Sequence, residues 1–269
     1  MTSDMLPWLA ASVLLIAFLY SSVGHAGASG YIAVMTLFGL APEEIKPTAL
    51  VLNILVASIG TWQFWRAGHF RWEIFWPFAV LAIPGAFLGG YWNLPADVFK
   101  IVVGVVLLFS AVRLMWDPRE APTTHPPALH TSLITGGLLG LLAGLTGTGG
   151  GIFLTPLMIL MRWAPTKVAA ATSVLFILCN SISGLLGNLS ATRDFPAIAV
   201  VLAAAAIVGG FVGAHLGSRR FSPTIIKRLL AAVLIIAGLK LIGLELPINA
   251  PTIRPPSHVG NSVKPPTTR

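Results

Sequence analysis

The chain is a succession of long apolar runs separated by short polar connections. The runs lie at about 7–23, 31–41, 48–65, 74–92 and 96–115, and again at about 132–145, 152–163, 168–188, 196–217 and 223–243. Most of them approach the roughly 20 residues that an α-helix needs to cross the hydrocarbon core of a bilayer. The pattern therefore predicts an all-α fold, a polytopic bundle of transmembrane helices.

Two of these runs are too short to cross a membrane. The runs at 31–41 and 152–163 hold 11 and 12 residues, which at about 1.5 Å per residue reach half of a bilayer. Each follows a glycine-rich stretch: GHAGASG at 24–30, here the first glycine loop, and TGTGGG at 146–151, the second glycine loop. We expect about eight spanning helices and two half-helices that begin at re-entrant glycine loops.

Composition supports a lipid environment. The chain is 55% hydrophobic and 10% charged, whereas a soluble domain carries about 25% charged residues. The net charge of +8 would suggest nucleic acid in a soluble protein, but basic residues in short loops between apolar runs mark membrane topology instead. We expect the lipid bilayer as a partner and no nucleic acid. The single Cys179 excludes a cysteine metal cluster, and the absence of GKT or GKS leaves no support for ATP hydrolysis, so we expect no cofactor and no metal.

The two sets of runs form a diverged internal repeat. A shift of 123 residues places Gly24 on Gly147, and a shift of 124 places Gly85 on Gly209. The predicted organisation is a first transmembrane repeat over 1–116, a polar proline-containing linker over 117–131, a second repeat over 132–244 and a disordered tail over 245–269. Repeats of this kind are typical of secondary transporters, in which two similar halves rock about a site between them.

The distribution of Lys and Arg indicates how the halves are oriented. If the chain turns back at each glycine loop, ten basic residues lie on one side and four on the other, leaving aside the distal tail. If the chain passes straight through, the division is eight against six. The positive-inside rule requires an asymmetry. We therefore expect inverted repeats in the cytoplasmic (inner) membrane, with both termini outside the cytoplasm.

The glycine loops are the candidate binding site. Irregular backbone at membrane depth is tolerated only against protein or a watery cavity. The start of each half-helix offers unpaired N–H groups and the positive end of a dipole, which together favour an anion near the midplane. The candidate substrate-binding residues are Gly24, His25, Gly27, Ser29, Thr146, Thr148, Gly149 and Gly150 in the loops, and Asn53, Thr172, Ser173 and Asn180 on the helices that follow, with Thr48 as a further hydroxyl.

Acidic residues are informative by their positions. All nine lie at segment ends, in loops or in the termini. A cation substrate or a carboxylate proton relay would require one inside the membrane. The pattern favours an anionic or neutral substrate, and any proton linkage is expected to run through His25. The small-residue pairs Gly85/Gly89 and Gly209/Gly213 are interpreted as helix-packing motifs.

The second half resembles a known family. The run Gly147-Thr148-Gly149-Gly150-Gly151, followed by Leu154-Thr155-Pro156-Leu157 and then Ala170-Ala171-Thr172-Ser173, is similar to the sulfite exporter (TauE/SafE) type of membrane permease. The first half departs from it, because His25, Ala26 and Ala28 interrupt the glycine run and Ala33 stands where Pro156 stands in the repeat. The resemblance implies a transporter of small sulfur oxyanions or organosulfonates, such as sulfite or sulfoacetate. The exact substrate, the direction, the coupling ion and a homodimeric state are left open.

Features of the sequence also fit two other classes of protein. Gly27-Ala28-Ser29-Gly30 matches the GxSG of rhomboid-type intramembrane proteases, and Ala214-His215-Leu216-Gly217 looks like their histidine motif. A serine nucleophile needs a base within hydrogen-bond reach, yet the two motifs lie in different repeats, and short matches are common in a chain with 27 glycines. The other alternative is a structural membrane protein without a substrate, since packing alone accounts for small residues. The sequence predicts a transporter without catalytic residues.

Overall fold

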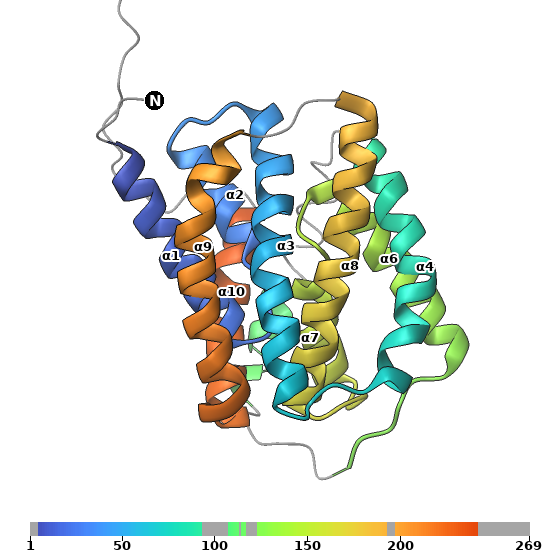
Figure 1. The fold of residues 1–269 in the computed structure, drawn as a ribbon. Helices are drawn as coiled ribbons and strands as arrows, with labels where there is room; N and C mark the ends of the chain where they lie inside the picture. Colours follow the sequence, from blue (N-terminus) through green and yellow to red (C-terminus); the bar gives the residue numbers. More distant parts are fainter. Residues whose placement is uncertain (1–4, 93–106, 113, 117–122, 193–196, 242–269) are drawn as a thin grey trace, which may run out of the picture.

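The computed structural model describes residues 5–92, 107–112, 114–116, 123–192 and 197–241. The helices are α1 (Leu6–Ser22), α2 (Ala28–Leu37), α3 (Pro42–Arg66), α4 (Trp72–Tyr91), α6 (Leu129–Thr146), α7 (Gly151–Leu160), α8 (Thr166–Thr192), α9 (Ala197–His215), the π-helix η2 (Leu216–Arg220) and α10 (Pro223–Leu241), with a short apolar helix over Leu107–Trp116 (Figure 1). The described residues contain no strand, and the all-α prediction is confirmed. The expected tail, the start of the linker and most of the run at 96–115 lie outside the described residues.

The helices divide into long and short ones. Five of those described are long and apolar enough to cross a membrane: α3, α4, α6, α8 and α9 with its π-helical end. By contrast, α2 and α7 have 10 residues each, which corresponds to about half of a bilayer. The two predicted half-helices are therefore confirmed, and α6 begins three residues before the predicted apolar run.

The chain turns back at both glycine loops. The residues that cap α2 and α7, Gly27 and Gly150, have φ values of 103° and 79°, a left-handed conformation that glycine adopts without a steric penalty. After each loop the half-helix returns toward the face from which the preceding helix came (Figure 1). The long helices α3 and α8 consequently run in opposite directions (Figure 1), which is the inverted arrangement predicted from the basic residues.

Glycine seams join helices of different halves. In α6, Gly136, Gly140 and Gly144 lie so close to the backbone of α4 that a Cβ atom would overlap its carbonyl oxygens. Likewise, Gly209 and Gly213 of α9 lie equally close to the backbone of α1 in the first half. A Cβ on Gly85 would come within 2.9 Å of the Gly137 carbonyl oxygen. The interpretation of these small residues as packing motifs is confirmed.

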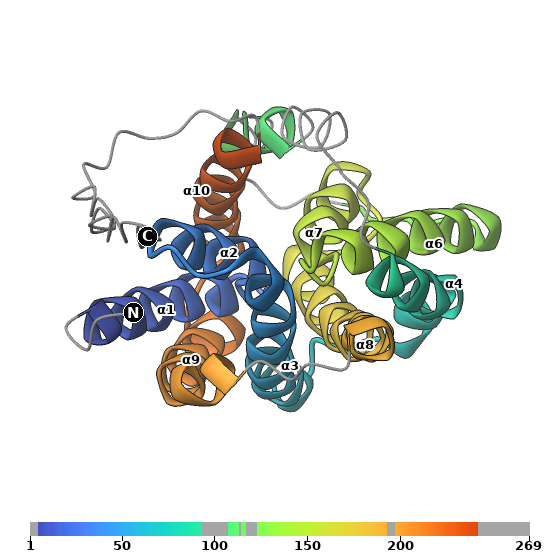
Figure 2. The same cartoon turned by 90° about the horizontal axis from the view of Figure 1, so that it is seen from above.

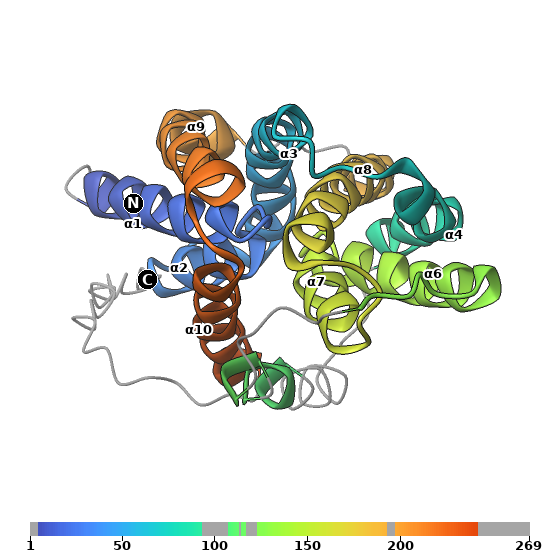
Figure 3. The same cartoon turned by 90° about the horizontal axis from the view of Figure 1, so that it is seen from below.

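The two halves exchange one helix each. The most extensive packing of α4 is with α6 and α8 of the second half, and that of α9 is with α1 and α3 of the first half. Seen from either end, α1, α2, α3, α9 and α10 gather on one side and α4, α6, α7 and α8 on the other (Figures 2 and 3). We call these groups the first and the second lobe. The long helices α3 and α8 pack against each other where the lobes meet.

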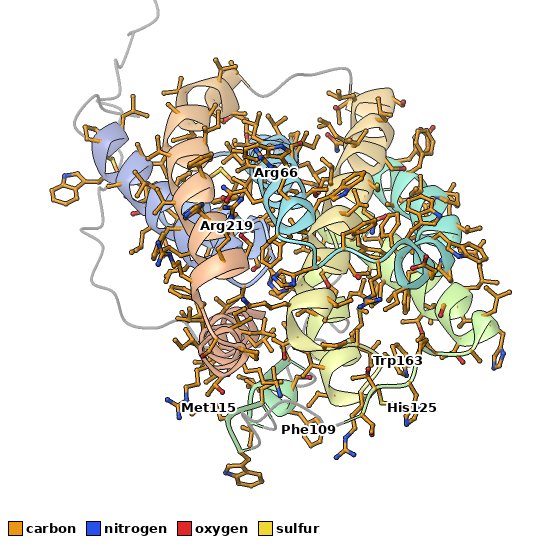
Figure 4. The ribbon with its side chains drawn as sticks, turned by 60° about the horizontal axis from the view of Figure 1, so that its bottom comes forward. Arg66, Phe109, Met115, His125, Trp163 and Arg219 are labelled. Atoms are coloured by element: carbon orange, nitrogen blue, oxygen red, sulfur yellow. The ribbon has the colours of Figure 1, made fainter. Side chains whose placement is uncertain are left out.

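One end of the bundle is strongly basic. The basic side chains described there are Arg66, Arg71, Arg162, Lys167, Arg219, Arg220, Lys227 and Arg228. At the opposite end the described side chains include one lysine, Lys46, in the second turn of α3. The basic end is turned forward in Figure 4, with Arg66 and Arg219 marked. On this face the His125 N–H donates to the Arg162 carbonyl oxygen (2.9 Å) and the rings of Trp163 and Phe78 pack 5.9 Å apart.

Candidate functional site

The second glycine loop lies between the two long helices. A Cβ built on Gly149 would be 3.0 Å from Asn53 Nδ2 of α3 and 2.9 Å from Ser181 Oγ of α8. A Cβ built on Gly151 would be 3.2 Å from the Ser173 carbonyl oxygen. Gly149 has a φ of 72°, a conformation that favours glycine. Because Gly149 has no side chain, its backbone lies directly against both helices. The site therefore draws on the first lobe through α3 and on the second lobe through α8 and the loop.

The first glycine loop is held by a side chain. His25 is 2% exposed, and its Nε2 is 2.8 Å from Thr155 Oγ1 in the half-helix of the other repeat. Its other ring nitrogen, Nδ1, is buried and has no hydrogen-bond partner among the described residues. Gly24 lies against Ala170 in the first turns of α8. A Cβ built on Gly24 would be 2.7 Å from the Cα of Ala170. The first loop is thus bound to α7 and α8 of the second lobe.

Both loops present backbone N–H groups without acceptors. In the part of the chain that the structure describes, no acceptor is bonded to the N–H groups of Ala26, Gly27, Ala28, Gly149, Gly150 and Gly151. These groups stand at the starts of α2 and α7, where the helix dipole adds positive potential. An oxyanion is the ligand for which such a helix start is suited.

Buried side chains near the second loop also lack partners. Both polar atoms of the Asn180 amide, Asn53 Oδ1 and Ser173 Oγ have no hydrogen-bond partner among the described residues. All three residues are no more than 1% exposed. A buried polar group left unpaired costs about 1–3 kcal/mol, so a ligand that hydrogen-bonds to these groups would be stabilised by them. Thr172 Oγ1, Thr48 Oγ1 and the Tyr31 hydroxyl are buried and unpaired as well.

The other candidate hydroxyls are already engaged. Ser29 Oγ is 2.9 Å from the Tyr20 hydroxyl, and this phenol, rather than His215, is the partner of the serine. Thr146 Oγ1 donates to the Leu142 carbonyl (2.7 Å) and lies 2.8 Å from Thr148 Oγ1. The structure thus places Asn53 beside Gly149, the Ser173 carbonyl beside Gly151, and Gly150 against Phe176 of α8 and Ala143 of α6, while Asn180 stands seven residues after Ser173 on α8. It places Gly24, His25, Gly27 and Ser29 in the first loop beside α7 and α8, and Thr146 and Thr148 at the end of α6.

Some neighbours of the loops were not predicted from the sequence. Thr155 forms a hydrogen bond with His25, and the Cγ of Lys46 is 3.0 Å from a Cβ built on Gly147. Thr155 belongs to the LTPL motif that follows the second loop, and that motif is the signal that pointed to its place. Lys46 carried no signal, because a lysine near a helix start is ordinarily interpreted as interfacial.

The charges around the site are few. The described acidic residues Glu43, Glu44 and Glu73 lie in the first turns of α3 and α4. Among the described residues, no group of three His, Cys, Asp or Glu could hold a metal ion. The loops and their neighbours therefore offer N–H dipoles, amides and hydroxyls, with the Lys46 ammonium nearby, and this set of groups can bind an anion.

Comparison with known proteins decides the family. The model of the sulfite exporter TauE/SafE family matches residues 9–241. The chain belongs to this family. A probable membrane transporter protein of Sinorhizobium fredii, y4hK, is 40% identical over 239 residues, covering 87% of this chain and 97% of the relative. No solved structure matches.

More distant relatives carry the same description. A probable membrane transporter protein of Bacillus subtilis, YjnA, is 27% identical over 85% of this chain and 96% of its own length. Another from Methanocaldococcus jannaschii is 23% identical over 87% of this chain and 94% of its own length. The TauE/SafE match covers both repeats and both glycine loops. The molecule is accordingly a multi-pass membrane protein of a transporter family.

Proposed function

We propose that this protein is a secondary transporter for a small oxyanion, most specifically a sulfur oxyanion or organosulfonate such as sulfite or sulfoacetate. The substrate would bind between the lobes at the second glycine loop. One observation carries the proposal: the unpaired N–H groups of Gly149, Gly150 and Gly151 lie against α3 and α8, and these two helices carry Asn53, Ser173 and Asn180, whose buried side chains have unpaired polar atoms. Members named in the comparisons are called membrane transporters without a substrate, so the substrate class rests on this chemistry and on the family description.

The donors around the second loop suit an oxyanion. Three backbone N–H groups, a hydroxyl and an amide nitrogen can each donate to an oxygen that carries negative charge. A sulfite or sulfonate group has three such oxygens and could engage several donors at once. The carboxylates described lie away from the loops, at the starts of α3 and α4, so they would not repel the anion.

The inverted arrangement gives a route for transport. Because α3 and α8 belong to different lobes and run in opposite directions, a rocking motion of one lobe against the other would expose a site between them to each face in turn. Two buried contacts cross between the lobes near the site, His25 with Thr155 (2.8 Å) and Asn53 with Ser181 (3.3 Å). Such contacts would change as the lobes move.

Orientation in the inner membrane follows from the charges. The basic end of the bundle would face the cytoplasm and both termini would lie outside it. A C-terminal fusion to a reporter that is active only in the cytoplasm should be silent, while the same reporter inserted after Gly68, in the turn between α3 and α4, should be active. The reverse pattern would contradict the orientation.

A binding panel tests the substrate class. The purified protein is heated with sulfite, sulfate, sulfoacetate, taurine or acetate, and its melting temperature is recorded. A ligand at a hundred times its Kd stabilises the folded state by about 2.7 kcal/mol, so sulfite or sulfoacetate should raise the melting temperature clearly. Uptake of the stabilising anion into proteoliposomes should follow. A panel in which acetate and taurine stabilise as well as the sulfur oxyanions would reject the sulfur specificity, and a panel without any effect would reject the anion site.

A further inference from the structure

The two lobes are also joined at the two membrane faces, in each case by a lysine. At one face, Lys46 of α3 donates from Nζ to the carbonyl oxygens of Gly90 (3.3 Å) and Gly89 (3.5 Å) in the last turn of α4. At the basic face, Lys167 of α8 donates from Nζ to the carbonyl oxygen of Ser218 (3.3 Å) in η2. Each ammonium thus reaches from one lobe to the other.

The two lysine contacts occupy similar places in the two halves. Each lysine stands in the first two turns of the long helix of its half. Each donates to the end of the helix that follows in that half. The lysines are not themselves equivalent in the repeat, because the shift of 123 residues that places Gly24 on Gly147 places Lys46 on Ala169. Because the halves are inverted, the two contacts lie at opposite faces of the membrane.

Each lysine is also close to the glycine loop of the opposite half. The stem of Lys46 lies against Gly147, with its Cγ 3.0 Å from a Cβ built there. Lys167 is three residues before Ala170, against which Gly24 of the first loop lies, and residues three apart share a helix face. On α3, Lys46 and Asn53 are seven residues apart and therefore also share a face, along which the second loop runs from Gly147 to Gly149.

The acceptors of the two lysines are weak. Within the described part of the chain they are carbonyl oxygens at 3.3–3.5 Å, and neither ammonium has a carboxylate partner there. The Ser218 carbonyl is shared with His69 Nε2 (3.0 Å). A half-buried ammonium has three donors, and a charge in this setting binds an anion more strongly than a neutral carbonyl. The loops and amides of the site supply dipoles, whereas these lysines supply full positive charges.

We propose that Lys46 and Lys167 are paired, anion-responsive gates, one at each membrane face. Each holds the lobes together while its ammonium is bonded to carbonyl oxygens of the opposite lobe. An oxyanion that arrives from that face binds the ammonium in place of the carbonyl oxygens, so the contact between the lobes breaks. The anion then moves to the adjoining glycine loop. This inference rests on the proposed oxyanion transport and adds the residues that admit the substrate from each side.

The test measures substrate affinity from each face separately. Sulfite flux is recorded in right-side-out and in everted membrane vesicles that contain the parent protein, Lys46→Gln or Lys167→Gln. Each variant should raise the half-saturating sulfite concentration by about tenfold or more from its own face only, since a charge-assisted hydrogen bond is lost there. Lys46→Arg and Lys167→Arg, which keep the charge, should recover most of the affinity. Arg162→Gln, an exposed charge on the same face as Lys167, is the matched control and should leave both values unchanged.

The outcomes separate the two proposals. Equal losses from both faces, or no loss in either glutamine variant while the parent transports sulfite, would overturn the gates and leave the transport function standing. A parent that neither binds nor moves any anion of the panel would overturn both. If a glutamine variant does not fold, acetylation of the parent by a lysine reagent is compared with and without sulfoacetate by mass spectrometry. Sulfoacetate should protect Lys46 and Lys167 from acetylation, and unchanged labelling of both lysines would overturn the proposal.

Discussion

The two glycine loops occupy equivalent places in the repeat and are built differently. The second loop consists of backbone at its centre, with Gly149 and Gly150 at φ values of 72° and 79° and unpaired side chains of α3 and α8 around it. The first loop carries His25, whose ring reaches across to Thr155 in the half-helix of the other repeat. The pair shows how one ancestral turn can diverge, with one copy keeping an open backbone surface and the other forming a contact between lobes. We therefore expect substitutions in the second loop to change binding, and substitutions at the first-loop contact to change stability.

The largest effect is expected from Gly149→Val. A β-branched side chain resists the left-handed conformation and would occupy the space beside Asn53 and Ser181. Loss of two hydrogen bonds to a charged ligand costs about 3–6 kcal/mol, which corresponds to a hundredfold or greater loss of sulfite affinity, measured by titration of the purified protein. Gly39→Val is the matched control, because Gly39 has the same φ of 72° with no atom within 4 Å of its Cβ position. Full affinity in folded Gly149→Val would make the second loop a structural turn.

A smaller loss of affinity is expected from Asn180→Leu, with a gain in stability. The amide of Asn180 is buried and has no partner among the described residues, so an apolar side chain of similar size removes a cost of about 1–3 kcal/mol. The melting temperature without ligand should rise while sulfite affinity falls by roughly tenfold. Ser183→Ala is the control, since Ser183 Oγ donates to the Ile83 carbonyl (2.6 Å), and its loss should lower stability without changing affinity. A destabilised Asn180→Leu protein would indicate that the amide has a structural partner.

The first loop is tested by Thr155→Val. This change leaves His25 Nε2 buried without its partner and should lower the free energy of unfolding by about 1–3 kcal/mol. The affinity for sulfite should change by less than about threefold, since the second loop is intact. Thr36→Val removes a hydroxyl that bonds within its own helix, to the Ile32 carbonyl, and should be nearly neutral. Thermal unfolding and ligand titration on the same samples separate the two loops, and a large loss of affinity in Thr155→Val would contradict their division of roles.

The smallest effect concerns pH. Burial lowers the pKa of His69, which lies in the connection between α3 and α4, and the nearby Lys167 ammonium lowers it as well, against the hydrogen bond to the Ser218 carbonyl. The folded state therefore favours neutral His69. Its contribution to stability is present above the unfolded pKa of about 6.5 and is lost as the pH falls below that value. The melting temperature should fall between pH 7.5 and pH 5.5, and His69→Gln should reduce this fall. An identical pH dependence in the variant would exclude His69 as its source.

Local features of this fold could be predicted from the sequence, and contacts between distant residues could not. The half-helices follow from run lengths, and the turns at Gly27 and Gly150 follow from the conformations that glycine permits. Gly85 and Gly209 were identified as packing residues because close helix approach requires small side chains. The contact of His25 with Thr155 joins residues 130 positions apart, and no periodicity encodes such a distance. The same is true of Lys46 beside Gly147, which depends on how the two lobes pack together.

The structure shows which of the candidate polar side chains have hydrogen-bond partners within the protein, which the sequence did not indicate. Asn53 and Asn180 were both predicted from their places on the helices that follow the glycine loops, and their environments differ, because Asn53 Nδ2 donates to Ser181 Oγ (3.3 Å) while the Asn180 amide is unpaired among the described residues. Ser29 and Thr146 were selected as hydroxyl donors, and both have partners within the protein. Hydroxyl rotors find local acceptors readily, so a sequence cannot distinguish an engaged hydroxyl from an available one.

The glycine seam between α1 and α9 has a consequence for how the protein is made. The hydroxyl of Ser21 donates to the Gly210 carbonyl across 189 residues of sequence, so the face of α1 that fits α9 has no native partner until most of the chain has been translated. At about 5–20 residues per second that delay is roughly 10–40 s. During this time the face of α1 that will pack against α9 is open to other helices in the membrane. A chain terminated before α9 should accordingly be recognised as an orphan and degraded, and supplying the second half from a separate gene should rescue it.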